Sequence, residues 1–350
     1  MTGTKNMIVY GFGTETVPSM KKDPRFFTPE VYHTMNIINE CDKEEHSRMR
    51  RMLSFAFSMS NLMRNEDVLI RRTDDFLDAI GGIESEDGKN GINIVRKFNY
   101  VTFNIMGEMS FGDSWDLRLK EQAEHRYHWA DVIVNSTYMN DVMRAVVCVP
   151  GLFSFLERFP PAHSKQTLYR HAEYTTEHTE ARLKLQTDRK DFMYHILNAK
   201  GLAATPKEIA SHYNVIMMAG AVTTATFLSG VMYYLGHNRQ ALNRLQDELC
   251  SKFPSIEAID SKGLLDCVYL NAVVEEGLRI YPPAGAAHLS RIVPMGGLAY
   301  LEMRMVLAKL FWKYDLCWFN SEDVDWERDT RGYTLWEKPE LRCTFRERVM

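Results

Sequence analysis

The sequence predicts a mainly α protein organised around one long central helix, and three observations lead to this prediction. Residues 213–236 contain no charged side chain, which is typical of a transmembrane span or of the central buried helix of a large domain. Apolar residues recur with a helical period in most other stretches, between proline and glycine breaks. Neither the strand–helix alternation of a parallel α/β protein nor the regular short strands of a sandwich is found. We therefore expect one helical domain over residues 1–350.

The composition is that of an ordinary folded protein. Of its 350 residues, 45% are hydrophobic and 25% are charged, and a net charge of −4 gives no reason to expect a nucleic-acid partner. The six cysteines form no CxxC pair and no zinc-type spacing, so we expect reduced thiols and a cytoplasmic location. The N-terminal residues contain no apolar run long enough for a signal peptide, and we expect no membrane anchor.

The central helix has a clear start signal. Thr205 is expected as the N-cap and Pro206 at the first helical position, with Glu208 reaching back to complete a capping box. A helix over residues 206–235 would be roughly 45 Å long at ~1.5 Å per residue. Residues 219–224, AGAVTT, place a glycine and two hydroxyls inside it, and both features weaken a helix. This weak point suggests that something large lies against the helix.

The same periods predict the other elements in chain order. Helices are expected over residues 43–58, 61–80, 94–111, 122–150, 169–198, 239–253, 264–281 and 298–316. A short extended piece is expected over residues 288–293. The alternation of Leu341, Cys343 and Phe345 with polar residues indicates a C-terminal strand.

Two helices carry polar pairs on one face. His46 and Arg50 are four residues apart. Their spacing alone favours a solvated basic face, and the sharper alternative is a grip on an anionic group, since guanidinium suits carboxylates and phosphates. Glu276 and Arg279 are three residues apart, as in an ordinary surface pair, but the largely apolar neighbours on that helix count against this interpretation.

Four stretches together resemble the cytochrome P450 family in its fungal, membrane-bound form. AGAVTT at 219–224 is similar to the family's AGx(D/E)TT segment on the central helix. EGLR at 276–279, followed by YPP at 281–283, resembles the ExxR helix and its proline exit. HSRMRR at 46–51, continuing to AFS at 56–58, is similar to the HxRxRR…AFS helix near the haem. LAYLEMR at 298–304 resembles the helix that follows the haem-binding loop. In order and rough spacing, these stretches cover nearly the whole chain.

The resemblance implies a role for each matching residue. Thr223 would relay protons to oxygen bound on the haem iron, and Ala219 and Gly220 would open the groove for that oxygen. The residues that would contact the haem propionates are His46, Arg50 and Arg291. Glu276 and Arg279 would form a buried structural ion pair, which is costly to break. An intact member would act on a lipophilic small molecule at the endoplasmic-reticulum membrane, with electrons from NADPH delivered by a reductase.

The departures from the family pattern are equally informative. In the family, a loop of the form FxxGxRxCxG supplies the thiolate that ligates the iron, whereas in this chain Gly297 runs directly into Leu298. None of the six cysteines stands in a CxG frame, and Val222 replaces the acid of the central motif. Most of the family's sheet also has no counterpart. We therefore expect an incomplete domain, truncated at its N-terminus and with an internal deletion at the 297/298 junction.

Three functions remain open. The first is a degenerate family member that keeps the helical core, binds haem weakly or not at all, and has lost catalysis. The second is a working haem-thiolate monooxygenase of fungal secondary metabolism whose gene model lacks an exon, and which would hydroxylate or epoxidise a lipophilic molecule. The third is a helical membrane protein that spans at residues 213–236, although the capping signal and the ordered motifs argue against it.

Overall fold

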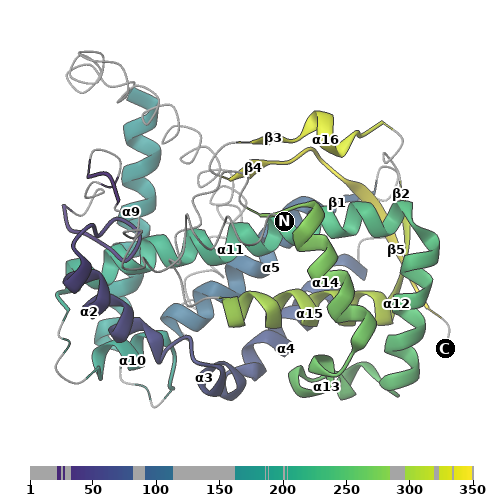
Figure 1. Ribbon diagram of the computed structural model, residues 1–350, viewed down its shortest axis with the longest axis horizontal. Helices are drawn as coiled ribbons and strands as arrows, with labels where there is room; N and C mark the ends of the chain where they lie inside the picture. The colour runs from purple at the N-terminus through teal and green to yellow at the C-terminus, as the bar shows by residue number, and fades with distance from the viewer. Residues whose placement is uncertain are drawn as a thin grey trace, which may run out of the picture.

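The computed structural model describes residues 22–24, 27, 33–81, 91–112, 162–185, 187, 189–199, 202, 204–283, 296–318, 323–332 and 335–348. Its fold is mainly α, as the sequence predicts (Figure 1). The helices are α2 (Lys43–Ser54), α3 (Met59–Arg64), α4 (Glu66–Gly81), α5 (Ile94–Phe111), α9 (Ala162–Lys184), α10 (Phe192–Leu197), α11 (Pro206–His237), α12 (Arg239–Lys252), α13 (Ser261–Leu265), α14 (Val268–Ile280), α15 (Gly296–Lys313) and α16 (Trp326–Asp329). The helix expected over 122–150 and the extended piece at 288–293 lie outside the described residues.

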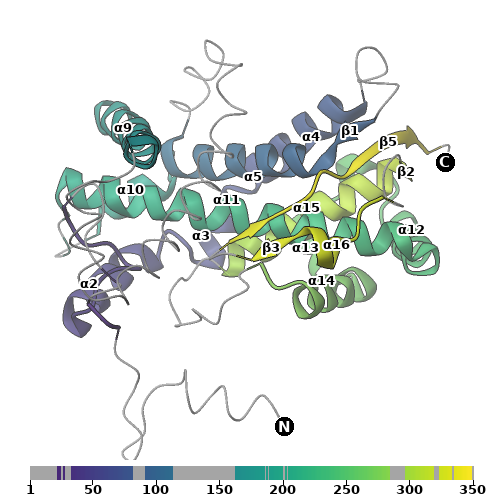
Figure 2. The ribbon, with the colours of Figure 1, turned by 90° about the horizontal axis from the view of Figure 1, so that it is seen from above.

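The central helix α11 runs across the molecule, with α5 along one side of it and α14 and α15 on another (Figures 1 and 2). Thr205 is its N-cap as predicted, because the Glu208 N–H donates to the Thr205 Oγ1 at 3.2 Å. In the described part of the chain, α11 is the one helix long and apolar enough to cross a membrane, yet 83% of its most apolar window is buried by the fold. Its apolar surface is therefore already used in the core, as in the buried-helix interpretation.

Several of the expected helices are shorter than predicted. The helix expected at 43–58 ends at Ser54, and Ser58 then caps α3 by accepting the Asn61 N–H at 3.3 Å. The helix expected at 61–80 is interrupted at Asn65, which separates α3 from α4. The helix expected at 169–198 is replaced by α9 and α10, and α10 begins at its own cap, Asp191.

Two further boundaries depend on neighbouring elements. The helix expected at 264–281 is divided into α13 and α14, because Glu248 of α12 accepts the backbone N–H groups of Tyr269 and Leu270 at 2.8 Å and so caps the start of α14. The helix expected at 298–316 begins earlier, at Gly296, and ends at Lys313. Strand β2 (Tyr314–Trp318) takes over its last predicted turn.

The sheet content is small. The strands β1 (Ile92–Asn93), β5 (Arg342–Glu347) and β2 form an antiparallel sheet in the order β1-β5-β2, with Ile92 opposite Cys343 and Leu316 opposite Phe345. The predicted C-terminal strand is therefore confirmed. A second antiparallel pair joins β3 (Arg331–Gly332) to β4 (Trp336–Glu337).

An aromatic cluster docks the C-terminal segments onto α11 and the end of α14. Tyr281 packs directly on Gly230 of α11, where any side chain would collide with its ring. Trp326 of α16 is buried and stacks on Tyr233, with ring centroids 5.5 Å apart. The ring of Trp336 lies 5.5 Å from that of Tyr281, and its indole N–H donates to the Pro282 carbonyl at 2.8 Å. These contacts hold β3, β4 and α16 against the central helix.

Candidate functional site

A cavity of about 260 Å³ lies between α5, α11 and α15. We call it the α11 groove, and its lining residues are Met106, Ala219, Gly220, Thr223, Thr224, Gly296, Leu298, Ala299 and Glu302. Three residues predicted from the sequence, Ala219, Gly220 and Thr223, therefore meet in one cavity. The helix that carries LAYLEMR forms its opposite wall, so two of the four family-like stretches face each other.

The weak point of α11 lies at this groove. The Thr223 hydroxyl donates to the Ala219 carbonyl at 2.6 Å, one turn earlier in the same helix. Such a bond competes with the helical ladder, and Gly220 within that turn leaves the wall without a side chain. Val222, which stands where the family motif has an acid, packs instead against Leu335 beside Phe103. At this position of α11 the chain therefore has an apolar side chain, and no described residue of α11 brings a carboxylate into the groove.

The groove does contain a carboxylate to which the sequence pattern assigns no role. Glu302 of α15 lies in its wall, fully buried, and neither of its oxygens has a hydrogen-bond partner among the described residues. Burial raises the pKa of Glu302 to about 8, and the nearby Thr224 hydroxyl partly opposes that rise. The signal available in the sequence is one acidic residue in the apolar run LAYLEM, and the motif alone does not distinguish it from a surface carboxylate.

The basic pair on α2 lies outside the groove lining. His46 is half-buried, and its Nε2 is buried without a hydrogen-bond partner in the described part of the chain. Burial, with the nearby charges of Lys22 and Arg50, lowers the pKa of His46. Arg50 itself is exposed. This cationic surrounding suits an anionic group, but the structure does not bring His46 or Arg50 to the groove, and Arg291 lies outside the described residues.

Another residue of α2 fixes this helix to the start of α11. Arg48 forms an ion pair with Glu208, and its Nε also contacts Glu45 at 2.7 Å. The Glu208 carboxylate lies 3.6 Å from the His212 Nε2. Burial favours a higher pKa for Glu208, but hydrogen bonding with His212 and Arg48 outweighs it and lowers that pKa. The carboxylate of Glu208 therefore serves this contact with α2 rather than the predicted capping box.

The predicted pair Glu276–Arg279 forms, but it is not buried. Two guanidinium nitrogens of Arg279 contact the two carboxylate oxygens of Glu276 at 2.6 Å, and Arg279 lowers the pKa of Glu276. The side chains are 56% and 68% exposed, so the prediction of a buried pair was wrong. The buried face of α14 consists of Leu270, Val274 and Gly277. Glu276 and Arg279 lie outside that face, so their side chains are exposed to solvent.

The cysteines do not complete a haem-thiolate site in the described structure. The five described cysteines, Cys41, Cys250, Cys267, Cys317 and Cys343, are free thiols, and none of them lines the α11 groove; Cys148 lies outside the described residues. Burial raises the pKa of Cys41, Cys267 and Cys343, whereas a metal ligand must be a thiolate. The groove therefore contains the hydroxyl residue that the family resemblance singles out, and no described cysteine lies in its lining.

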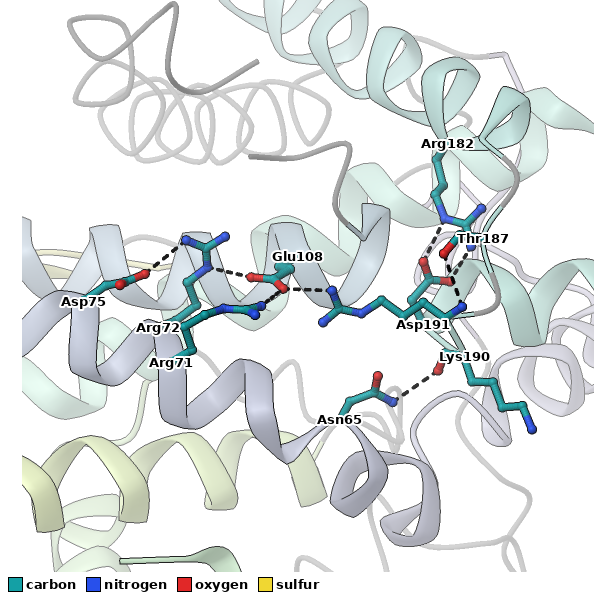
Figure 3. A network of polar contacts seen from close by, with 10 residues as sticks. Asn65, Arg71, Arg72, Asp75, Glu108, Arg182, Thr187, Lys190 and Asp191 are labelled. Carbon is teal, nitrogen blue, oxygen red and sulfur yellow. Dashed lines mark hydrogen bonds and ion pairs between the residues drawn. The ribbon is translucent and has the colours of Figure 1, made fainter. Parts of the chain in front are cut away.

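A second polar cluster lies near the groove-lining helices and is shown in Figure 3. Three guanidinium groups from α4 and from the segment before α10 surround the buried carboxylate of Glu108 on α5; they belong to Arg71, Arg72 and Arg189. Beside it, Arg182 of α9 makes a two-point contact with Asp191, at 2.7 and 2.9 Å. This cluster ties α4, α5, α9 and α10 together, and its contacts are those of a structural network.

Comparisons with known proteins agree with the motifs. The family model for cytochrome P450 matches residues 9–295. The chain is 32% identical over 295 residues to cytochrome P450 monooxygenase efuB of Hormonema carpetanum, covering 83% of this chain and 57% of that protein. It is 27% identical over 406 aligned positions to cytochrome P450 monooxygenase astJ of Aspergillus oryzae. That alignment covers 95% of this chain and 79% of astJ. This chain therefore spans little more than half the length of efuB. It belongs to the cytochrome P450 family.

Proposed function

We propose that this chain keeps the helical core and the α11 groove of a cytochrome P450 but does not insert oxygen into a substrate. The observation that carries the proposal is the groove lining, which among the described residues includes Thr223 and no cysteine. In the family, the axial thiolate holds the iron and pushes electron density that favours O–O cleavage. Without that ligand, haem would be held only by apolar contact and propionate contacts, and the binding would be weak.

The comparisons support an internal deletion as the origin of this loss. The alignment with astJ covers 406 positions, although the chain has 350 residues, so at least 56 aligned positions have no residue of this chain. The family match ends at residue 295, two residues before Gly297. Both observations agree with a missing segment at the 297/298 junction, where the family has its cysteine loop.

The remaining roles are proposed residue by residue. Thr223 supplies a hydroxyl to the groove, and Ala219 and Gly220 let a bound molecule approach the α11 backbone. His46 and Arg50, with Arg291, are the groups proposed to meet haem propionates, and the unpartnered Nε2 of His46 beside Lys22 supports an anion at that position. Glu276 and Arg279 form an ion pair on the exposed surface of α14 and do not contribute to the α11 groove.

The spectrum of the reduced protein with carbon monoxide tests the proposal. The purified chain, incubated with haemin, should show no thiolate-type Soret band. The matched control carries an FxxGxRxCxG segment inserted between Gly297 and Leu298, and it should gain that band if the rest of the fold is competent. A thiolate-type band from the chain without the insertion would refute the proposal.

A second candidate concerns the natural gene product. The relatives are fungal proteins that carry the name cytochrome P450 monooxygenase, which supports an NADPH-dependent monooxygenase of fungal secondary metabolism that acts on a lipophilic molecule. Its reductase and the endoplasmic-reticulum membrane would be its partners. The transcript across the codons of Gly297 and Leu298 decides between the two candidates. An in-frame segment that encodes the cysteine loop favours the second, and a contiguous transcript excludes it.

A further inference from the structure

Three polar atoms in the wall of the α11 groove have no partner. They are the two carboxylate oxygens of Glu302 and the hydroxyl oxygen of Thr224, all buried and without a hydrogen bond to any third residue of the described structure, although the Thr224 hydroxyl lies close enough to Glu302 to lower its pKa. Buried polar atoms in folded proteins are nearly always hydrogen-bonded, and a specific exception requires an explanation. Here the exceptions come from two helices, α11 and α15, and meet at one cavity.

An ionised carboxylate without a partner costs more free energy to bury than a hydroxyl without a partner. A carboxylate in an apolar interior requires a paired cation or a proton. Burial and the Thr224 hydroxyl are the influences on the Glu302 pKa, and no charged group of the described residues acts on it. The protein therefore offers this carboxylate no counter-ion in the part of the chain that the structure describes.

Apart from Glu302, Thr224 and Thr223, whose hydroxyl donates to the Ala219 carbonyl, the described lining residues of the groove are apolar or glycine. Its lining includes Met106 of α5, Ala219 of α11 and, from α15, Leu298 and Ala299. A volume of about 260 Å³ is several times the ~30 Å³ that one water occupies in the liquid. The groove therefore has room for a small organic molecule whose body is apolar and whose polar end reaches Glu302.

We propose that the α11 groove binds a small apolar molecule that carries one primary amine, with its ammonium group on Glu302 and Thr224. A primary ammonium presents three N–H donors and no acceptor, which matches the three unpartnered oxygens. A neutral alcohol of the same shape carries no charge and a single donor, so it cannot form the charge-assisted hydrogen bonds that an ammonium makes with a carboxylate. The proposal rests on the proposed function only in requiring a groove that no haem fills.

Binding must release a proton. Near pH 7 an alkylamine is protonated, since such amines have pKa values near ~10.4, and Glu302, with a pKa of about 8, holds its proton as well. Formation of the ammonium–carboxylate pair leaves one proton too many, and it passes to the buffer. No bond other than O–H is broken, and no oxidant or reductant is needed.

Isothermal titration calorimetry of the purified chain, without added haem, tests this inference. Cyclohexylamine is titrated at pH 7 in two buffers of different ionisation enthalpy, and the difference in measured heat gives the number of protons released. We expect about one proton for each amine bound, and cyclohexanol should bind at least about tenfold more weakly with no release, as expected for loss of charge-assisted hydrogen bonds. Equal affinity for the two ligands would overturn the proposal.

Variants locate the site. Glu302→Gln keeps the shape of the side chain and should lose both the proton release and the preference for the amine, whereas Glu337→Gln, at an exposed position of β4, should retain both. If Glu302→Gln does not fold, Ala299→Leu fills the groove while keeping the carboxylate, and it should abolish amine binding. Amine binding with proton release that persists in Glu302→Gln and in Ala299→Leu would contradict the proposal. A thiolate-type Soret band, by contrast, would refute the proposed function in a separate measurement.

Discussion

Glu108 and Glu302 are two carboxylates in equivalent burial, each 1% exposed, and the protein treats them in opposite ways. Glu108 on α5 is surrounded by three guanidinium groups (Figure 3). Glu302 on α15 faces an apolar groove and has no hydrogen-bond partner among the described residues. The same desolvation is thus compensated in one place and left uncompensated in the other.

The difference separates a structural charge from a functional one. A buried carboxylate that is fully paired fixes the helices that supply its partners, and its removal leaves those partners without a counter-ion. A buried carboxylate without a partner holds a proton and is ready to exchange it for a ligand, which is why shifted pKa values mark functional sites. Four substitutions test this distinction, from the largest expected effect to the smallest.

Glu108→Gln should be the most damaging substitution. It leaves Arg71, Arg72 and Arg189 close together without the carboxylate, and breaking a buried ion pair in this way costs about 3–5 kcal/mol. Urea unfolding at neutral pH measures the loss in free energy of unfolding. The control is Asp75→Asn, which removes the exposed partner of Arg72 at 3.2 Å and should cost about 0–1 kcal/mol. Equal losses in the two variants would contradict the structural role of Glu108.

Glu302→Gln should change the pH dependence of stability rather than lower stability at every pH. The folded pKa of about 8 lies above the ordinary value of 4.5, so the folded state binds the extra proton between these values. The contribution of Glu302 to stability is therefore complete below pH 4.5 and falls by ~1.4 kcal/mol per pH unit up to about pH 8. Urea unfolding at several pH values should show the variant gaining on the wild type over this range. Parallel curves would show that Glu302 is paired after all.

Lys338→Met tests the same principle with the opposite charge. The Lys338 amine donates to the Thr226 hydroxyl on α11 at 2.8 Å, and burial lowers its pKa from 10.5 to about 7. The unfolded chain then holds the extra proton between these values, so the contribution of Lys338 makes stability rise with pH by up to ~1.4 kcal/mol per unit.

Because Lys338 as a residue is only partly buried, the observed slope should lie below that limit. The variant should remove the slope, and Lys313→Met, which alters a cation at the end of α15, should leave it in place. Urea unfolding between about pH 7 and pH 10 provides the measurement. A slope that survives in Lys338→Met would place its amine in solvent.

Glu276→Gln should have the smallest effect. The Glu276–Arg279 pair has good geometry, but both partners are largely exposed, and exposed ion pairs contribute little once solvent screens them. Urea unfolding should give the same free energy for wild type and variant within the error of the measurement. A loss similar to that of Glu108→Gln would mean that a further element covers this face of α14 in solution.

The central part of the fold was predictable from the sequence because its signals are local. Thr205 and Pro206 define the start of α11, and the apolar period of α5 stops at Gly112, whose φ of 64° is favourable for glycine. The predicted groove residues Ala219, Gly220 and Thr223 lie on one face of one helix. Their common face therefore required only that α11 be continuous, whereas the cavity also needed α5 and α15 to pack beside it.

The errors have a different origin, since they depend on contacts between distant segments. The break before α14 is stabilised by Glu248, about twenty residues earlier in the chain, and no local pattern reports it. The exposure of Glu276 depends on which face of α14 meets α11. The role of Glu302 depends on its having no cationic neighbour among the described residues, which becomes visible only when the surrounding helices are in place.

The aromatic cluster around Tyr281 gives the molecule an internal optical probe. Trp326 is sealed between Tyr233 and Tyr281, while Trp336 is only partly covered. Undocking of the C-terminal segments from α11 would move both indoles into water and shift their emission to longer wavelength. The chain has six tryptophans, so the part of its emission change that is lost in Trp326→Phe and Trp336→Phe variants follows the attachment of the C-terminal segments to the central helix, without an added label.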